Sequence, residues 1–200
     1  MDINIKAFEI TAQAAKDFLQ KVVTPPLEEI GGLLADQIKI FRLKNQVQIL
    51  KKAEDYMNQN GLKTRKVNLK VLVPMLENSS LEEDESLQDK WASLFVNTVR
   101  DDSHINTTLF SHILSQMTRN DANLFNEIFE YCTQTTVNGN KRITIKFADT
   151  AYFMKSKDSA FIIDNLLRLR LIKEKPMVGR LPERYYVTEL GLSFMMAIMK

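Results

Sequence analysis

Cysteine and histidine are scarce in this chain of 200 residues, which contains one cysteine and two histidines. A single cysteine, Cys132, excludes a framework of internal disulfides and fits the reducing cytoplasm, where we expect the protein to reside. The two histidines, His104 and His112, lie eight residues apart. No cysteine or histidine pair has the spacing of a zinc site, and we expect no metal site.

Glycine is also scarce, and the six glycines are scattered along the chain. The pair Gly31-Gly32 lacks the Gly-Lys-Ser/Thr sequence that completes a phosphate-binding loop, so we expect no nucleotide cofactor, and no other cofactor is indicated. No segment approaches the ~18 uninterrupted apolar residues of a membrane-spanning helix, and we expect no membrane contact. The first 20 residues lack the basic start and apolar run of a signal peptide.

The residues that are present predict helices through most of the first half. Apolar positions three and four apart predict a helix over residues 27–60, which begins after Pro25-Pro26 and ends at Gly61. The apolar positions in its second half are Phe41, Leu43, Val47, Leu50 and Met57. Pro74 predicts that the next helix is short or kinked.

A dense acidic cluster opens the stretch "EEDESLQDKWASLF", residues 82–95. Leu87, Trp91 and Phe95 lie on one face of a predicted helix, and we interpret them as core residues. The acids then occupy the helix start, where carboxylates are favoured, and Ser79/Glu82 and Ser80/Glu83 have capping-box spacing. A metal or acid–base site is the less favoured alternative, because neighbouring acids on one run cannot surround an ion.

Three ordered segments carry a family resemblance: "PPLEEIGGLLADQIKIFRLKNQVQIL", "VLVPMLENSSLEEDESLQDKWASLFVNTV" and "FSHILSQMTRNDANLF". Together they resemble the abortive-infection alpha family over roughly residues 25–130. The last segment contains the turn Met117-Thr118-Arg119-Asn120-Asp121-Ala122, which is similar to a turn of that family. The resemblance implies a bacterial protein of phage defence. It supplies no catalytic residues that could be carried over to this chain.

The last third has a different pattern, in which Thr118 begins a helix, "RITIKF" alternates as a strand does, and residues 157–169 form a helix. With "NLLRLRLIKEK" and "RYYVTELGLSFM", this order resembles a winged helix. Residues 119–200 contain 13 Lys/Arg and 9 Asp/Glu, a net charge of +4, whereas residues 1–118 contain 14 and 16, a net charge of −2. Five cations are candidate nucleic-acid or partner-binding residues: Arg168, Lys173, Lys175, Arg180 and Arg184.

These observations predict a mainly α fold, with an N-terminal helical bundle (residues 1–117) and a C-terminal winged-helix-like α+β domain (residues 118–200). We predict a non-enzymatic phage-defence protein that acts through binding. Asp158 and Asp164 on the helix that would read DNA favour a protein partner or self-association, and nucleic acid stays open as a partner. The alternatives are a winged-helix DNA-binding regulator and a toxin-like effector whose catalytic residues meet only in space.

Overall fold

The structure, a computed structural model of the chain, describes residues 17, 21, 40–102, 105, 108–137, 140–143, 148–149, 157–175 and 184–199. The chain forms two compact units, each of which is described by itself. We call residues 1–116 with 197–200 the helical unit, and residues 117–196 the C-terminal unit. The sequence predicts two domains, residues 1–117 and 118–200, each of which would fold by itself. Whether they fold independently stays a prediction.

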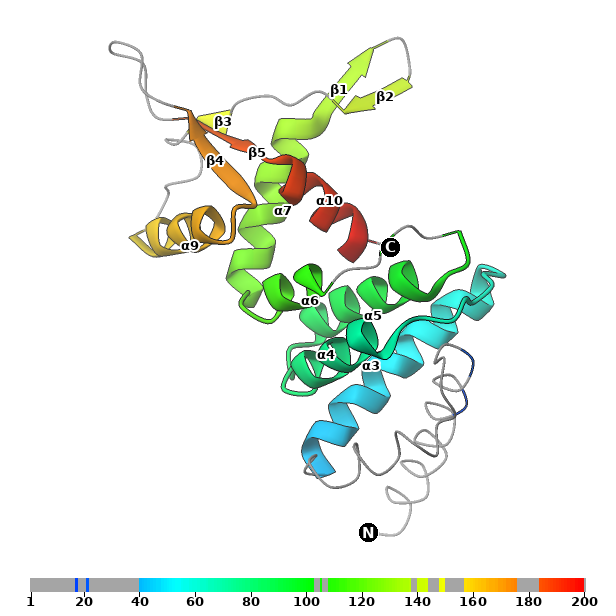
Figure 1. The fold of residues 1–200 in the computed structure, drawn as a ribbon. Coiled ribbons are helices and arrows are strands. Elements are labelled where there is room, and N and C mark those ends of the chain that lie inside the picture. Colours follow the sequence, from blue (N-terminus) through cyan, green and yellow to red (C-terminus); the bar gives the residue numbers. More distant parts are fainter. Residues whose placement is uncertain are drawn as a thin grey trace. The chain divides into compact units, whose positions relative to one another are not determined.

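Helices make up most of the described chain, so the predicted mainly α fold is confirmed (Figure 1). The helical unit contains α3 (Ile40–Gln59), α4 (Leu69–Ser79), α5 (Glu85–Val99) and α6 (Leu109–Leu114). The C-terminal unit contains α7 (Arg119–Thr133), β1 (Gln134–Val137), β2 (Asn140–Ile143), β3 (Ala148–Asp149), α9 (Lys157–Arg168), β4 (Ile172–Lys175), β5 (Arg184–Val187) and most of α10 (Glu189–Ile198). Within the described residues, no helix is both long and apolar enough to cross a membrane.

The end of α3 follows from one glycine. Gly61 adopts a left-handed backbone with φ of 61°. The N–H of Leu62 donates to the carbonyl of Met57 at 2.9 Å, and that of Gly61 donates to Asn58 at 3.3 Å. Glycine takes this conformation without steric cost, so the predicted stop at Gly61 is confirmed. The predicted start of this helix at Leu27 lies outside the described residues.

Helix α4 is short and contains Pro74, as the sequence predicts. It begins after Asn68, whose side chain accepts a hydrogen bond from the Lys70 N–H at 2.8 Å. Such a cap satisfies one of the N–H groups that a helix leaves unpaired in its first turn. The helix ends at Ser79, eleven residues after Asn68. Residues 82–85, which we call the acidic segment, follow shortly after it.

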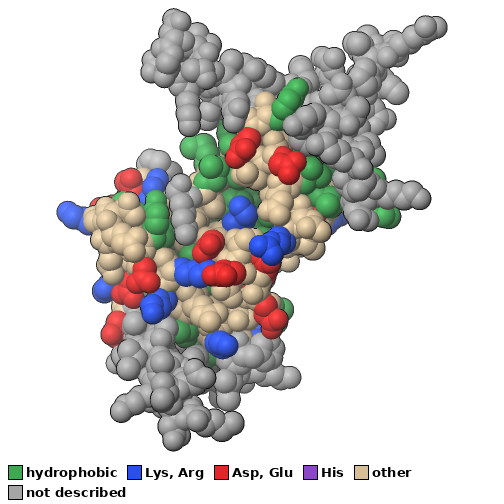
Figure 2. Space-filling view, turned by 180° about the vertical axis from the view of Figure 1, so that it is seen from behind, with side chains coloured by type: hydrophobic (Ala, Val, Ile, Leu, Met, Phe, Trp, Pro, Cys, Tyr) green, Lys and Arg blue, Asp and Glu red, His purple; other side chains and the backbone are tan. Residues whose placement is uncertain are grey.

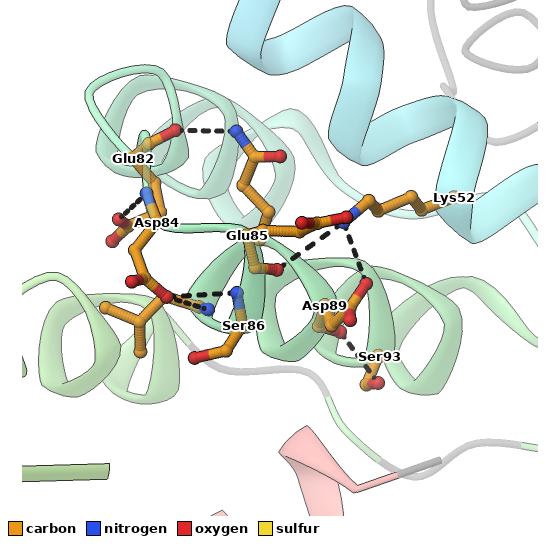
Figure 3. A network of polar contacts seen from close by, with 9 residues as sticks. Lys52, Glu82, Asp84, Glu85, Ser86, Asp89 and Ser93 are labelled. Carbon is orange, nitrogen blue, oxygen red and sulfur yellow. Dashed lines mark hydrogen bonds and ion pairs between the residues drawn. The ribbon is translucent and has the colours of Figure 1, made fainter. Parts of the chain in front are cut away.

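The acidic segment leads into α5, although the residue that caps this helix differs from the prediction (Figure 3). Asp84 is the N-cap, and its carboxylate accepts hydrogen bonds from the N–H groups of Ser86 (2.9 Å) and Leu87 (3.1 Å). The two predicted capping boxes are wrong, because Ser79 and Ser80 belong to the end of α4. Their hydroxyls donate to carbonyls of that helix, those of Leu76 and Glu77.

The core of the helical unit is built around α5, which packs along α3. Trp91 is fully buried, and Leu87 and Phe95 lie beside it on the helix with exposures of 3% and 1%. The indole Nε1 of Trp91 has no hydrogen-bond partner among the described residues, so this side chain contributes through packing.

On the α3 side of this core, the predicted apolar positions Val47, Leu50 and Met57 are buried, and one predicted position departs. Leu43 is 39% exposed, whereas Asn45 and Gln46 are buried. Their amides donate to main-chain carbonyls, Asn45 to Ser80 (3.1 Å) and Gln46 to Leu76 (2.7 Å). Both side chains are buried because carbonyls at the end of α4 lack a main-chain N–H partner in a following turn.

In the C-terminal unit, β5 lies between β3 and β4 in an antiparallel sheet, and β1 and β2 form a separate hairpin. The first two residues of the predicted strand "RITIKF", Arg142 and Ile143, lie in β2, and residues 144–147 lie outside the described residues. A sheet whose last strand is central, next to α7 and α9, is compatible with a winged helix. The winged-helix assignment stays a prediction.

Aromatic and aliphatic side chains fill the core of the C-terminal unit. The fully buried rings of Phe125 on α7 and Phe194 on α10 lie 6.3 Å apart between centroids. Ile163 and Leu166 on α9 are also buried, and they lie on one face of that helix. The side chain of Cys132 is not among those the structure describes.

We expect Trp91→Ala to lower the free energy of unfolding by about 3–5 kcal/mol, because it leaves a large cavity in the core. Denaturant unfolding of the full chain measures this loss. Leu81→Ala is the matched control, since Leu81 is 63% exposed and its removal should change stability by less than about 0.5 kcal/mol. Similar losses in the two variants would contradict the core role of Trp91.

Asp84→Ala should cost about 1 kcal/mol of unfolding free energy, because the N–H groups of Ser86 and Leu87 lose their acceptor. Asp84→Asn retains an acceptor oxygen and should cost much less. Thermal and denaturant unfolding of both variants measure the difference. If Asp84→Asn proved as destabilising as Asp84→Ala, the negative charge rather than the cap would be the source of the stability.

Candidate partner-binding site

Two carboxylates of the acidic segment, those of Glu82 and Asp84, bind main-chain N–H groups at the start of α5. The Glu82 carboxylate accepts from the Asp84 N–H at 2.9 Å, and the Gln88 amide donates to the Glu82 carbonyl at 2.9 Å. Burial raises the pKa of the Glu82 carboxyl, and the negative charges of Asp84 and Glu83 act in the same direction. Among the described residues, no group of three His, Cys, Asp or Glu side chains is arranged to hold a metal ion.

The five predicted basic residues divide between α9 and the β4–β5 hairpin. Arg168 is exposed in the last turn of α9, and Lys173 is exposed on β4. Lys175 and Arg184 are Cα partners where β4 and β5 pair, so the register brings these two positions together. Arg180 lies outside the described residues. The sheet therefore places two of the five predicted positions opposite each other, at the end of the hairpin where the connecting segment begins.

Arg168 is held by a chain of hydrogen bonds that reaches the start of α7. Its guanidinium donates to the Asn165 Oδ1 at 2.7 Å, and the Asn165 amide donates to the Asp121 Oδ1 at 3.0 Å. The other oxygen of Asp121 accepts from the N–H and hydroxyl of Thr118 at 2.7 and 2.6 Å. The Asp121 N–H in turn donates to the Thr118 hydroxyl at 3.3 Å, which completes a reciprocal cap.

This chain explains the turn at residues 117–122 that carries part of the family resemblance. Thr118 and Asp121 cap α7, and the free oxygen of the buried Asp121 fixes Asn165 on α9. The two helices are thereby locked to each other by polar contacts in addition to their apolar packing. Arg168 is presented to solvent in a defined position, which lowers the entropy cost of a contact with a partner.

Phe161 is a candidate binding residue that the sequence reasoning missed. It is 76% exposed, the highest value among the large hydrophobic side chains that the structure describes. Phe161 lies on the face of α9 opposite the buried Ile163 and Leu166, three residues before Asp164 and seven before Arg168. Helical spacing puts these three on one solvent face. The sequence contains a signal for this, because position 161 is apolar but lies opposite Ile163 and Leu166 at helical spacing.

Arg170 is the second residue that the sequence reasoning missed, and its backbone is unusual. Its φ is 61°, the left-handed region, at the end of α9 where glycine is the common residue. Two hydrogen bonds enforce this turn: the Leu171 N–H donates to Leu166 at 3.0 Å, and the Arg170 N–H donates to Leu167 at 2.9 Å. The Arg170 side chain and Lys173 line a cavity of about 530 Å³ whose other walls include Leu167 and Leu190.

Two arginines of the first half, Arg42 and Arg65, make contacts within the helical unit. Arg42 donates to the Ser80 hydroxyl (2.9 Å), and Arg65 donates to the carbonyls of Thr98 (3.1 Å) and Ile105 (2.7 Å). These arginines connect elements of the helical unit. On the face seen in Figure 2, basic and acidic side chains are interspersed rather than gathered into a patch of one sign. That surface does not have the single-sign field that attracts nucleic acid.

Comparison with known proteins identifies one family. The family model described as abortive infection alpha matches residues 35–198. No curated protein and no solved structure matches the chain. The match reaches much further along the chain than the resemblance noted over residues 25–130, and it includes the whole C-terminal unit. It covers more than half of the chain, and the protein therefore belongs to the abortive infection alpha family, whose name associates it with defence against phage.

Proposed function

We propose that the protein takes part in abortive infection by binding another protein through its C-terminal unit, without catalysing a reaction itself. Family membership supports the defence role. The observation that carries the mode of action is the solvent face of α9, where an exposed phenylalanine stands in line with two charged residues. An exposed aromatic side chain on a rigid helix is typical of an anchor at a protein interface.

The charges of this face favour a protein over DNA. Asp164 is exposed between Phe161 and Arg168, and its carboxylate would lie against the phosphates of a bound duplex. A protein partner can pair with both charges and bury the phenylalanine that lies one helical turn before Asp164. If the unit is a winged helix, α9 is the helix that would otherwise enter the major groove. An aromatic ring and an acid at its centre then indicate that the fold is used for protein recognition.

A DNA-binding regulator is the second candidate, and the hairpin supports it. The strand register sets Lys175 opposite Arg184, and Arg180 lies in the segment that connects their strands. A wing with several cations can contact phosphates without reading bases. The two candidates differ in which surface carries the affinity, α9 or the hairpin, and they can be separated by substitutions.

Phe161→Ala should abolish most of the protection that the chain gives to bacteria challenged with phage. Truncation of an aromatic anchor costs about 2 kcal/mol or more, which is roughly 30-fold in affinity. Plating efficiency of phage on cells that express the chain measures the effect. Tyr131→Ala is the matched control, because Tyr131 is 46% exposed on α7 and lies off this face. Full protection by a normally expressed Phe161→Ala variant would refute the role of α9.

Duplex DNA should bind the full chain negligibly near physiological salt. A fluorescence-anisotropy salt titration measures this directly. Were the hairpin a DNA-binding wing, log affinity would fall with log salt at a slope of about −0.9 per phosphate contact. Lys175→Gln with Arg180→Gln would then reduce the slope by up to ~2 on every sequence, while Lys63→Gln with Lys70→Gln would not. Tight, steeply salt-dependent binding that the first pair weakens would favour the regulator.

A further inference from the structure

A groove of about 660 Å³ runs along α3 in the helical unit and has walls of opposite charge. The wall formed by α3 carries Lys44, Lys51 and Lys52, with Asp55 at one end. The facing wall is the acidic segment and the start of α5, with Glu83 and Glu85. The charged side chains that line the groove are thus three cations and three anions, and their formal charges cancel.

One lysine already bridges the two walls, as Figure 3 shows. The Lys52 Nζ lies 2.9 Å from the Asp89 Oδ1 and 4.0 Å from the Glu85 Oε1. Lys44 and Lys51 are exposed and form no ion pair within the described part of the chain. They lie seven residues apart, about 10 Å along the helix axis, and so point from the same face of α3.

The walls of the groove are held by buried contacts. Asn45 and Gln46 bind the carbonyls at the end of α4, and Arg42 donates to the Ser80 hydroxyl. Asp84 caps α5 and fixes the start of the opposite wall. The charges therefore stand on a preformed surface, and a partner that matches them has little ordering cost to offset.

The charge pattern selects the partner. The three carboxylates would repel a polyanion such as nucleic acid as strongly as the three lysines attract it. A polycation would likewise be attracted by the carboxylates and repelled by the lysines. The partner must carry both signs, side by side, at the same separation. A second copy of this chain does so when it is turned by a two-fold axis, since the cationic wall of each copy then faces the anionic wall of the other.

We propose that this groove is a docking surface for a second copy of the chain, in a symmetric dimer in which the Lys44–Lys51 row of each copy pairs with Glu83 and Glu85 of the other. The proposal deepens the proposed function, because it adds self-association to a protein that acts through binding. It uses the helical unit and not α9, so either can fail alone. Exposed ion pairs are individually weak, and the dimer should therefore dissociate as salt is raised.

Sedimentation of the purified full chain over a range of concentrations tests the proposal by exchanging the charges. At low ionic strength the wild-type chain should dimerise, and Lys44→Glu with Lys51→Glu should be monomeric, as should Glu83→Lys with Glu85→Lys. An equimolar mixture of the two variants should form heterodimers, because reversed walls again meet opposite charges. Lys63→Glu with Lys70→Glu is the control, since both side chains are exposed, lie outside the groove and should leave the dimer intact.

Three results would overturn the proposal: a wild-type chain that stays monomeric at low salt, a mixture that does not pair, or a control that dissociates like the groove variants. Melting curves show whether each variant folds. If the exchange at Glu85 weakens α5, Glu83→Lys alone serves in its place. If a charge-reversed α3 does not fold, Lys44→Gln with Lys51→Gln should still raise the dissociation constant. An unchanged constant in that neutral variant counts against the dimer.

Discussion

Burial of the apolar face of α5 against α3 is the constraint on which the helical unit depends. The fully buried Trp91 cannot move without opening the core, so the register between the two helices is fixed. That register sets the acidic segment beside α3, and it brings Lys52 within reach of Asp89. The charged groove is therefore a consequence of how an apolar face is packed. The charged side chains line the groove, but the apolar packing of α5 against α3 determines its shape.

Polar side chains form hydrogen bonds with main-chain groups at helix ends, which apolar packing cannot satisfy. A helix ends with carbonyls that have no partner within it, and a buried helix end must find donors elsewhere. The end of α4 finds them in Asn45 and Gln46 of α3. In the C-terminal unit, Asp121 caps its own helix with one oxygen and binds Asn165 with the other. In both units a helix end is thus satisfied in a way that also fixes a neighbouring helix.

The two surfaces that follow from these contacts have different chemistry. The face of α9 combines an aromatic side chain with single charges and fits a protein that can bury Phe161. The groove on α3 has balanced charges, and we propose a copy of the same chain as its partner. The proposed dimer would present two α9 faces. Two linked faces would bind a repeated or dimeric partner more tightly than either face alone.

Sequence reasoning reached the features that local chemistry decides. Helical spacing identified Leu87, Trp91 and Phe95 as one face, and the backbone freedom of Gly61 identified the end of α3, because both depend only on nearby residues. The ordered segments were sufficient to indicate the family. The same reasoning placed the cap of α5 at two serines, since spacing alone does not tell whether a serine ends one helix or begins the next.

Tertiary structure decided the rest, for a physical reason that no window of sequence contains. Asn45 and Gln46 are buried although they are polar, because carbonyls some 30 residues away need donors. Leu43 is exposed, although it follows the apolar spacing and Val47, Leu50 and Met57 of the same face are buried. The groove, likewise, exists only where α3 meets a segment distant in sequence. The sequence by itself determined which residues could form a helix face, and three-dimensional packing determined which faces remained for binding.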